Sequence, residues 1–154
     1  MKMHPLRWFA LLVGAVLLSP GVHAETFVLV HGATAGGWEW KTTGKSLTDD
    51  GHTVYRATLT GLGEREHLNS PDVDLQMHIN DVVNLILYED LHDVVLTGHS
   101  YGGMVITGVI DRIPERIKHV VFLDAAVPED GMSLWDLFGG NGPQDPERFK
   151  DGFM

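Results

Sequence analysis

A serine stands between two glycines in residues 98–102 (G-H-S-Y-G), with the spacing G-x-S-x-G of a nucleophile elbow. In such an elbow a strand turns sharply into a helix, and the strained serine exposes its hydroxyl group. Side chains at Gly98 and Gly102 would collide, so glycine suits both positions. An apolar run precedes the motif and a helical pattern follows it. We therefore predict Ser100 as a nucleophile supported by His99; the alternative is a tight glycine turn without chemistry.

A second glycine-containing segment could supply the other half of this chemistry. Serine attack on a carbonyl needs two backbone N–H groups aimed at the developing oxyanion. We assign one to Tyr101, which follows the nucleophile, and the other to Ala33, in the loop after the first predicted strand. Gly32 allows a close approach of this loop, and His31 is predicted to brace it. A phosphate-binding loop is the alternative, but residues 32–37 (G-A-T-A-G-G) fit neither G-x-G-x-x-G nor a P-loop.

The elements that must position these residues alternate along the chain. Apolar, β-branched runs predict strands, and periodic segments predict helices. In the clearest helix, Ile79, Val82, Val83 and Ile86 form one stripe, so His78 is predicted at the helix surface. This order predicts an α/β fold whose parallel sheet has helices on both faces. The predicted strands are 27–30, 53–58, 93–97 and 119–123; the predicted helices are 38–50, 75–88, 102–113 and 133–138, with a polar loop at 61–74.

Four blocks of the sequence resemble one family. Residues 27–40 (F-V-L-V-H-G-A-T-A-G-G-W-E-W), 58–68, 97–103 (T-G-H-S-Y-G-G) and 114–133 are similar to bacterial α/β-hydrolases of the pyrethroid-hydrolase esterase type. They are also similar to the plant methylesterase and hydroxynitrile-lyase group. The resemblance implies the N-terminal part of an α/β-hydrolase fold. It also implies a Ser-His-Asp triad, a small-molecule ester substrate and no cofactor.

Two positions narrow this resemblance. Plant hydroxynitrile lyases have threonine where this chain has Gly32, which favours an esterase. A serine at position 100, where haloalkane dehalogenases and epoxide hydrolases have aspartate, argues against both of those classes.

The other triad members are harder to place. After Ser100 the only histidine is His119, at the start of a strand and on the order of 15 Å from the sheet edge that carries the elbow. Asp124 follows that strand at the correct edge and is a possible acid, although in the resembling family the acid comes one strand later. The resemblance implies that the base and acid lie beyond Met154. We therefore expect a partial sequence, a truncated reading frame or a pseudogene product, inactive alone.

The N-terminus has the three parts of a secretory signal. Lys2 and Arg7 precede an apolar run of eleven residues (8–18), and small residues lead to a cleavage site after Ala24. Eleven helical residues cover about half of a ~30 Å hydrocarbon core, so a stable membrane span is not expected. We predict export to the periplasm or cell exterior. The domains are then a signal peptide (1–24), a partial hydrolase domain (25–138) and a disordered tail (139–154).

Composition excludes several partners. The 154 residues carry 21 acidic against 11 basic side chains, a formal net charge of −10, which would repel nucleic acid and anionic membranes. The absence of cysteine excludes disulfides and thiolate metal sites. No two histidines lie three or four residues apart, so no helical metal site is predicted. The sequence predicts no particular oligomeric state.

Three functional hypotheses follow. The first is an exported serine esterase. The second is a non-catalytic ligand-binding protein on the same fold, comparable to hydrolase-like hormone receptors. The third is a carbon–carbon lyase or other non-hydrolytic member, against which Gly32 counts. A triad acid and histidine encoded downstream would separate the first hypothesis from the second.

Overall fold

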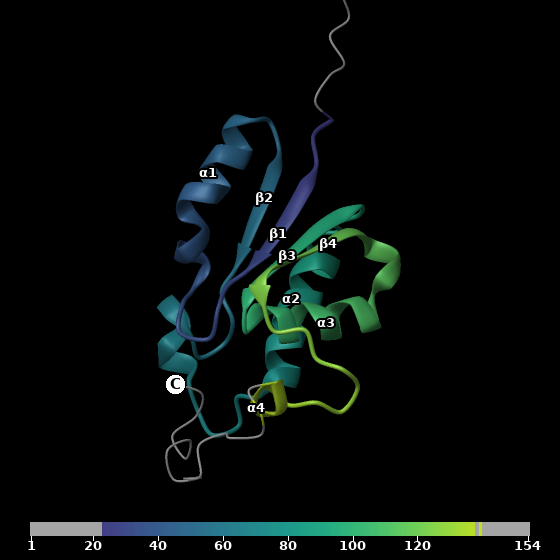
Figure 1. The fold of residues 1–154 in the computed structure, drawn as a ribbon. Helices are drawn as coiled ribbons and strands as arrows, with labels where there is room; N and C mark the ends of the chain where they lie inside the picture. The colour runs from purple at the N-terminus through teal and green to yellow at the C-terminus, as the bar shows by residue number, and fades with distance from the viewer. Residues whose placement is uncertain (1–22, 138, 140–154) are drawn as a thin grey trace, which may run out of the picture.

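Four parallel strands form one sheet in the order β2-β1-β3-β4, in a computed structural model that describes residues 23–137 and 139 (Figure 1). The predicted signal segment, apart from His23 and Ala24, and nearly all of the predicted tail lie outside the described residues. The strands are β1 (Thr26–Val30), β2 (Thr53–Ala57), β3 (Val94–Ser100) and β4 (Ile117–Ala125). The helices are α1 (Lys41–Asp49), α2 (Leu75–Tyr88), α3 (Gly102–Arg112) and α4 (Leu134–Leu137), with 3-10 turns η1 (Gly37–Trp40), η2 (Gly63–Leu68) and η3 (Pro114–Arg116).

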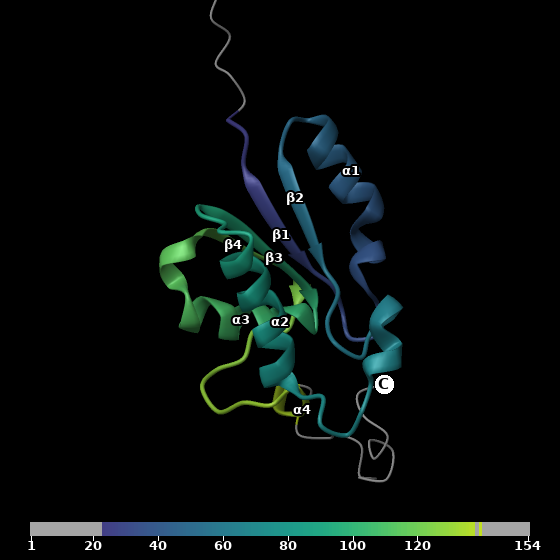
Figure 2. The same cartoon turned by 180° about the vertical axis from the view of Figure 1, so that it is seen from behind.

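The crossovers determine where the reactive loops meet. α1 packs on one face of the sheet, and α2 and α3 pack together on the other (Figure 2). Val30 at the end of β1 pairs with Gly98, and Ser100 pairs with Ala125 of β4. Because the strands are parallel, the loop after β1, the elbow and the end of β4 meet at one edge of the sheet. The predicted α/β fold class is confirmed.

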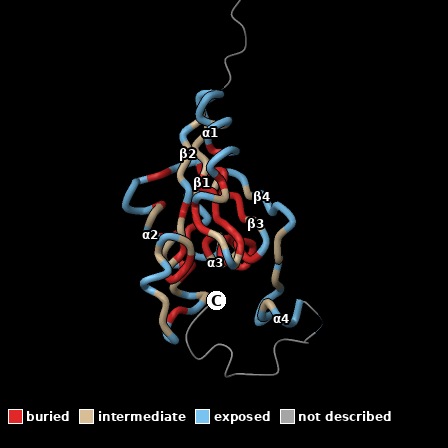
Figure 3. The backbone as a smooth tube through the Cα atoms, turned by 90° about the vertical axis from the view of Figure 1, so that its left-hand side faces the viewer, coloured by how far each residue is buried: buried red, intermediate tan, exposed pale blue. Residues whose placement is uncertain are grey.

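The core lies between the sheet and the α2–α3 layer, and burial is concentrated in β1 and β3 (Figure 3). Asp74 is the N-cap residue of α2. Its carboxylate accepts a hydrogen bond from Met77 N–H at 2.8 Å and so satisfies a helix donor that has no partner within the helix. The predicted apolar stripe of α2 is buried, but the surface prediction for His78 is wrong. This side chain is fully buried, and hydrogen bonds on both ring nitrogens offset the cost of removing it from water.

Some boundaries differ from the sequence-based prediction. The predicted helix 38–50 is divided into η1 and α1, and the predicted loop 61–74 contains η2. β4 is longer than predicted and includes Asp124. Across the described part of the chain, none of the helices has the length and apolar character needed to cross a bilayer.

Candidate active site

Ser100 ends β3 and has φ +52°, a left-handed conformation that is rare outside glycine. Its side chain is exposed at the carboxyl edge of the sheet. A Cβ at Gly98 would lie 2.7 Å from the Gly102 carbonyl oxygen, and a Cβ at Gly102 would lie 2.8 Å from the Val30 carbonyl oxygen. Both glycines therefore permit close backbone packing around the turn, as the elbow motif requires.

Ser100 opens into a hollow of about 470 Å³. The positions predicted for the oxyanion donors, Ala33 and Tyr101, line the same hollow, as does Asp124. The other lining residues are apolar and come from the end of β4, the loop after it and α4: Ala125, Ala126, Val127, Leu134, Trp135 and Leu137. The hollow therefore combines a mainly apolar wall with one carboxylate.

The β4 side of the hollow carries a bulge. Between the pairs His99–Leu123 and Ser100–Ala125 the register shifts, and the extra residue, Asp124, has φ +44°. Ala126 N–H donates to the Ser100 carbonyl oxygen at 2.9 Å, which fixes the exit of β4 against the elbow.

Gly103 is a site-supporting residue that the sequence analysis did not single out. A Cβ there would lie 2.1 Å from the Ala126 carbonyl oxygen. The second glycine of the Gly102–Gly103 pair was the available signal.

The β1 side of the hollow is fixed by His31, which is fully buried. Its Nε2 accepts from Leu59 N–H at 3.1 Å, so Nδ1 carries the proton and donates to the Gly32 carbonyl at 2.7 Å. Burial lowers the pKa of His31, which keeps the ring neutral. A Cβ at Gly32 would lie 3.3 Å from the Ser100 Cβ, so this loop passes directly beside the serine.

Glu39 of η1 joins this loop to the elbow and was not predicted. Its Oε2 accepts from Gly32 N–H at 3.0 Å, and its Oε1 lies 2.6 Å from His99 Nδ1. The second contact is a close polar pair rather than an aligned hydrogen bond. Glu39 lies near Gly32 in the chain, but no sequence pattern indicated its contact with His99, which is far away in the sequence.

A buried chain of hydrogen bonds also reaches Tyr101. Its hydroxyl donates to His78 Nδ1 at 2.9 Å, and His78 Nε2–H donates to the Thr60 carbonyl at 2.9 Å. Asp81 accepts from both Thr60 N–H and Thr60 Oγ1, at 2.6 and 2.9 Å. Burial raises the pKa of the Tyr101 phenol and lowers the pKa of His78, so both side chains stay neutral. Their hydrogen bond anchors Tyr101, the residue after Ser100, to α2.

Within the described residues, no histidine ring is hydrogen-bonded to Ser100 Oγ. The rings of His31, His78 and His99 contact other groups. His119 pairs with Val95, five positions before Ser100 along β3, and therefore lies roughly 16 Å from Ser100. Nor does any group of three or more metal-ligating side chains gather in this part of the chain.

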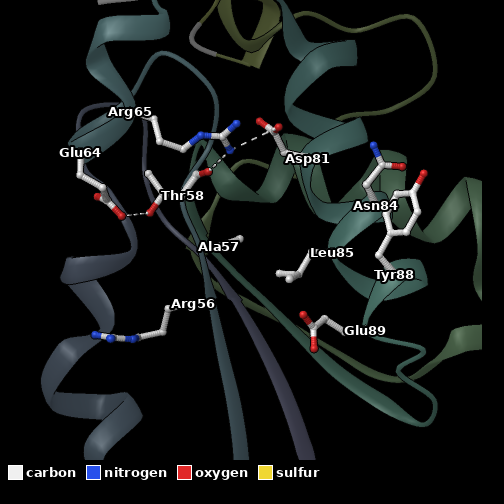
Figure 4. Close-up of a pocket in the computed structure, with 10 residues that line it drawn as sticks. All are labelled: Arg56, Ala57, Thr58, Glu64, Arg65, Asp81, Asn84, Leu85, Tyr88 and Glu89. Carbon is white, nitrogen blue, oxygen red and sulfur yellow. Dashed lines mark hydrogen bonds and ion pairs between the residues drawn. The ribbon is translucent and has the colours of Figure 1, made fainter.

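A second hollow, of about 450 Å³, lies at the β2 edge (Figure 4). Arg65 reaches across it and donates to the Thr58 carbonyl at 2.8 Å, with Asp81 at 3.5 Å. Glu64 accepts from Thr58 Oγ1 at 2.6 Å. Arg65 and Glu64 both contact Thr58, Arg65 pairs with Asp81, and Ser100 does not line this hollow.

The strand-turn-helix geometry at Ser100 and the sheet order are those of an α/β hydrolase, and a family model supports this class. The model described as the α/β hydrolase family matches residues 27–154, so the chain belongs to this family. Among characterised relatives, it is 55% identical over 111 residues to a carbendazim hydrolyzing esterase of Nocardioides sp. (strain SG-4G), covering 72% of this chain and 46% of that protein. It is 33% identical over 126 residues to methylesterase 1 of Arabidopsis thaliana, covering 79% and 48%.

Solved structures agree with the fold. An extracellular α/β-hydrolase from a Paenibacillus species superposes with a TM-score of 0.68 at 41% identity, covering 73% of this chain and 45% of that one. Polyneuridine aldehyde esterase gives 0.65 at 28% identity, covering 82% and 50%. The chain spans about half the length of the curated relatives that it matches.

Proposed function

We propose that the chain carries the nucleophile and oxyanion-binding part of a carboxylic-ester hydrolase, with Ser100 as the nucleophile. The observation that carries the proposal is the left-handed Ser100, which opens into a hollow that Ala33 and Tyr101 also line. The esterase names of the relatives agree with this assignment.

The chemistry assigns a role to each part. Ser100 Oγ attacks the ester carbonyl carbon, a C–O bond forms, and the carbonyl π electrons move to oxygen as an oxyanion. The N–H groups of Ala33 and Tyr101 donate to that oxyanion. When the carbonyl re-forms, the alcohol leaves with a proton, and water then hydrolyses the acyl-serine. His31 and Gly32 support the loop; Gly98, His99 and Gly102 form the elbow.

Ser100 also needs a proton acceptor. In this proposal the general base, and the acid that orients it, belong to the part of the hydrolase fold that corresponds to the relatives' other half. Asp124 is the second candidate for the acid, because it lines the hollow with Ser100 from the β4 bulge. Without a base, donors and binding alone sustain a residual rate, roughly 10³–10⁴ over water in a well-formed enzyme.

The decisive experiment compares the chain with Ser100→Ala. Both proteins are incubated with p-nitrophenyl acetate and, separately, with carbendazim, the compound in the name of the 55% identical relative. Intact-protein and peptide mass spectrometry then locate any acyl group. Because the general base belongs to the relatives' other half, we expect slow acylation, at Ser100 alone, and none in Ser100→Ala. Equal acylation of both proteins would overturn the nucleophile assignment. Ester binding without acylation would instead favour the non-catalytic ligand-binding protein.

Export is part of the same proposal, with cleavage after Ala24. Among the described residues, Glu25 is the first with hydrogen bonds to the sheet region. Its backbone N–H donates to His52 Nδ1 at 3.1 Å, its carbonyl accepts from Thr53 N–H at 2.9 Å, and its carboxylate pairs with Lys118 at 2.6 Å. A cut at this position leaves the fold intact. N-terminal sequencing of exported protein should begin at Glu25; retention of Met1 would contradict the proposal.

A further inference from the structure

Glu39 is the side chain that contacts both walls of the oxyanion site. It stands on η1, outside the elbow and outside the loop after β1. One carboxylate oxygen accepts from Gly32 N–H at 3.0 Å, and the other lies 2.6 Å from His99 Nδ1. Its side chain is only 24% exposed, so the contacts are partly shielded from water.

These two contacts stand next to the groups that the reaction uses. Gly32 immediately precedes Ala33, and His99 immediately precedes Ser100. The Trp40 ring packs edge-on against His99, with ring centroids 6.3 Å apart at 88°, and limits its rotation. Glu39 therefore fixes the distance between the segment that carries one oxyanion donor and the segment that carries the other.

The negative charge of Glu39 does not by itself favour the formation of an oxyanion. A carboxylate close to the point where negative charge develops raises the energy of the oxyanion, so its charge opposes the reaction. A benefit to the reaction must then come from geometry. Oxyanion donors act within a narrow range, about 2.7–3.1 Å from the oxyanion, and the loss of one costs roughly 10²–10³ in rate.

We propose that Glu39 is a positioning residue that ties the Gly32–Ala33 loop to the elbow and so sets the spacing of the two oxyanion donors. The inference rests on the proposed role of Ser100. Glu39 does not touch the substrate and exchanges no proton; it acts through the backbone of its two partners.

Two substitutions separate geometry from charge. Glu39→Gln keeps the length and an oxygen acceptor for Gly32 N–H, and its amide can donate to a His99 ring that carries its proton on Nε2. Glu39→Asp keeps the charge but is one methylene too short to hold both partners. Positioning predicts a nearly unchanged Gln variant and a slow Asp variant, whereas a charge effect predicts a faster Gln variant and an unchanged Asp variant.

The test uses the whole 154-residue chain and a fluorophosphonate probe, which forms a tetrahedral adduct on a nucleophilic serine. Labelling is followed by intact mass over a concentration series, which separates kinact from KI. We expect kinact to fall on the order of 10- to 100-fold in Glu39→Asp and Glu39→Ala with KI unchanged, since only the adduct needs both donors. Glu39→Gln should stay within about threefold of the parent chain. Glu66→Gln, the same charge change at an exposed carboxylate on η2, is the matched control and should label like the parent chain.

The outcomes are distinguishable from failure of the proposed function. Equal labelling of the parent chain and Ser100→Ala would overturn the nucleophile assignment itself. A fast Asp variant, or a change confined to KI, would overturn the positioning role while leaving Ser100 in place. Amide hydrogen exchange at Gly32 tests the tie without any reaction: it should accelerate in Glu39→Ala and not in Glu66→Gln, and unchanged exchange would refute the tie.

Discussion

Strands β3 and β4 lie side by side, and both carry an apolar run, yet their surroundings differ. The first five residues of β3 are all buried, whereas no residue of β4 is fully buried. Leu96 of β3 has no exposed surface, while Leu123 of β4 is 49% exposed. β3 lies between two strands and under α3. β4 is an edge strand of the described sheet; Val121, Phe122 and Leu123 on it are exposed, and its end packs against the start of α3. The hollow beside Ser100 therefore has one wall fixed by the core and one wall open to water.

The largest expected effect comes from removing the same atoms on both strands. Leu96→Ala should lower the free energy of unfolding by about 2–5 kcal/mol, because it leaves a cavity in the packed core. Leu123→Ala should lower it by only about 1 kcal/mol, because about half of this side chain is already exposed. Urea denaturation of both variants measures the difference. Similar losses in the two variants would mean that β4 is covered in solution.

The next prediction concerns the close contact between the start of α3 and the end of β4. Gly103→Ala places a Cβ against the Ala126 carbonyl, so the start of α3 and the exit of β4 must separate. We expect a loss of about 1–3 kcal/mol from overpacking. Gly44→Ala is the matched control in α1. Its Cβ would meet the flexible Arg56 side chain at 3.2 Å and Val54 Cγ1 at an ordinary 3.5 Å, and alanine raises the helix propensity. In thermal unfolding, the Tm of Gly103→Ala should be lower than the Tm of Gly44→Ala. The reverse order would contradict the close packing of α3 against the end of β4.

The same contrast explains what sequence could predict. The bounds of α2 match the prediction at both ends, because its apolar stripe and the Asp74 cap are local signals. The elbow was equally predictable from its G-x-S-x-G spacing. Gly98 is needed for a contact with nearby Gly102, whereas the contact of Gly102 with Val30 joins distant segments. The burial of His78 was not, because its partners are Thr60 and Tyr101, each about twenty positions away.

β4 shows the same limit from another side. Its apolar run correctly predicted a strand, but how far the strand is buried depends on neighbours that a run cannot specify, and β4 is an edge strand of the described sheet. The Glu39 contacts were also beyond sequence reasoning, because they depend on how η1 folds back over the elbow. What the sequence predicted were turns and periodic elements; what it could not predict were contacts between distant segments.

The buried side of the site should also respond to pH. Burial holds the pKa values of His31 and His78 below the ordinary value for histidine. As the pH falls, the unfolded chain therefore binds protons at these two side chains more readily than the folded chain does. Stability should therefore be constant above about pH 6.5 and fall as the pH drops below it, by up to about 1.4 kcal/mol per pH unit for each histidine.

Substitutions test whether the buried histidines cause this dependence of the free energy of unfolding on pH. His78→Gln and His31→Gln should each flatten it when urea denaturation is repeated from pH 7.5 down to about pH 5. His119→Gln, at an exposed position on β4, should leave it unchanged. A slope that survives both buried substitutions would place its origin in the carboxylates instead.

The smallest expected effect on stability belongs to the open wall. Val121, which is 41% exposed on β4, can be changed to threonine, which keeps a branched side chain suited to a strand and makes it polar. The free energy of unfolding should stay within about 0.5 kcal/mol. Binding of a hydrophobic dye and self-association by light scattering should both decrease, because exposed apolar edge strands promote association. A polar change at buried Val95 of β3 is the contrasting control, since it should destabilise the fold. If Val121→Thr destabilised the protein as strongly, the open wall would have to be covered in solution by a contact beyond the described residues.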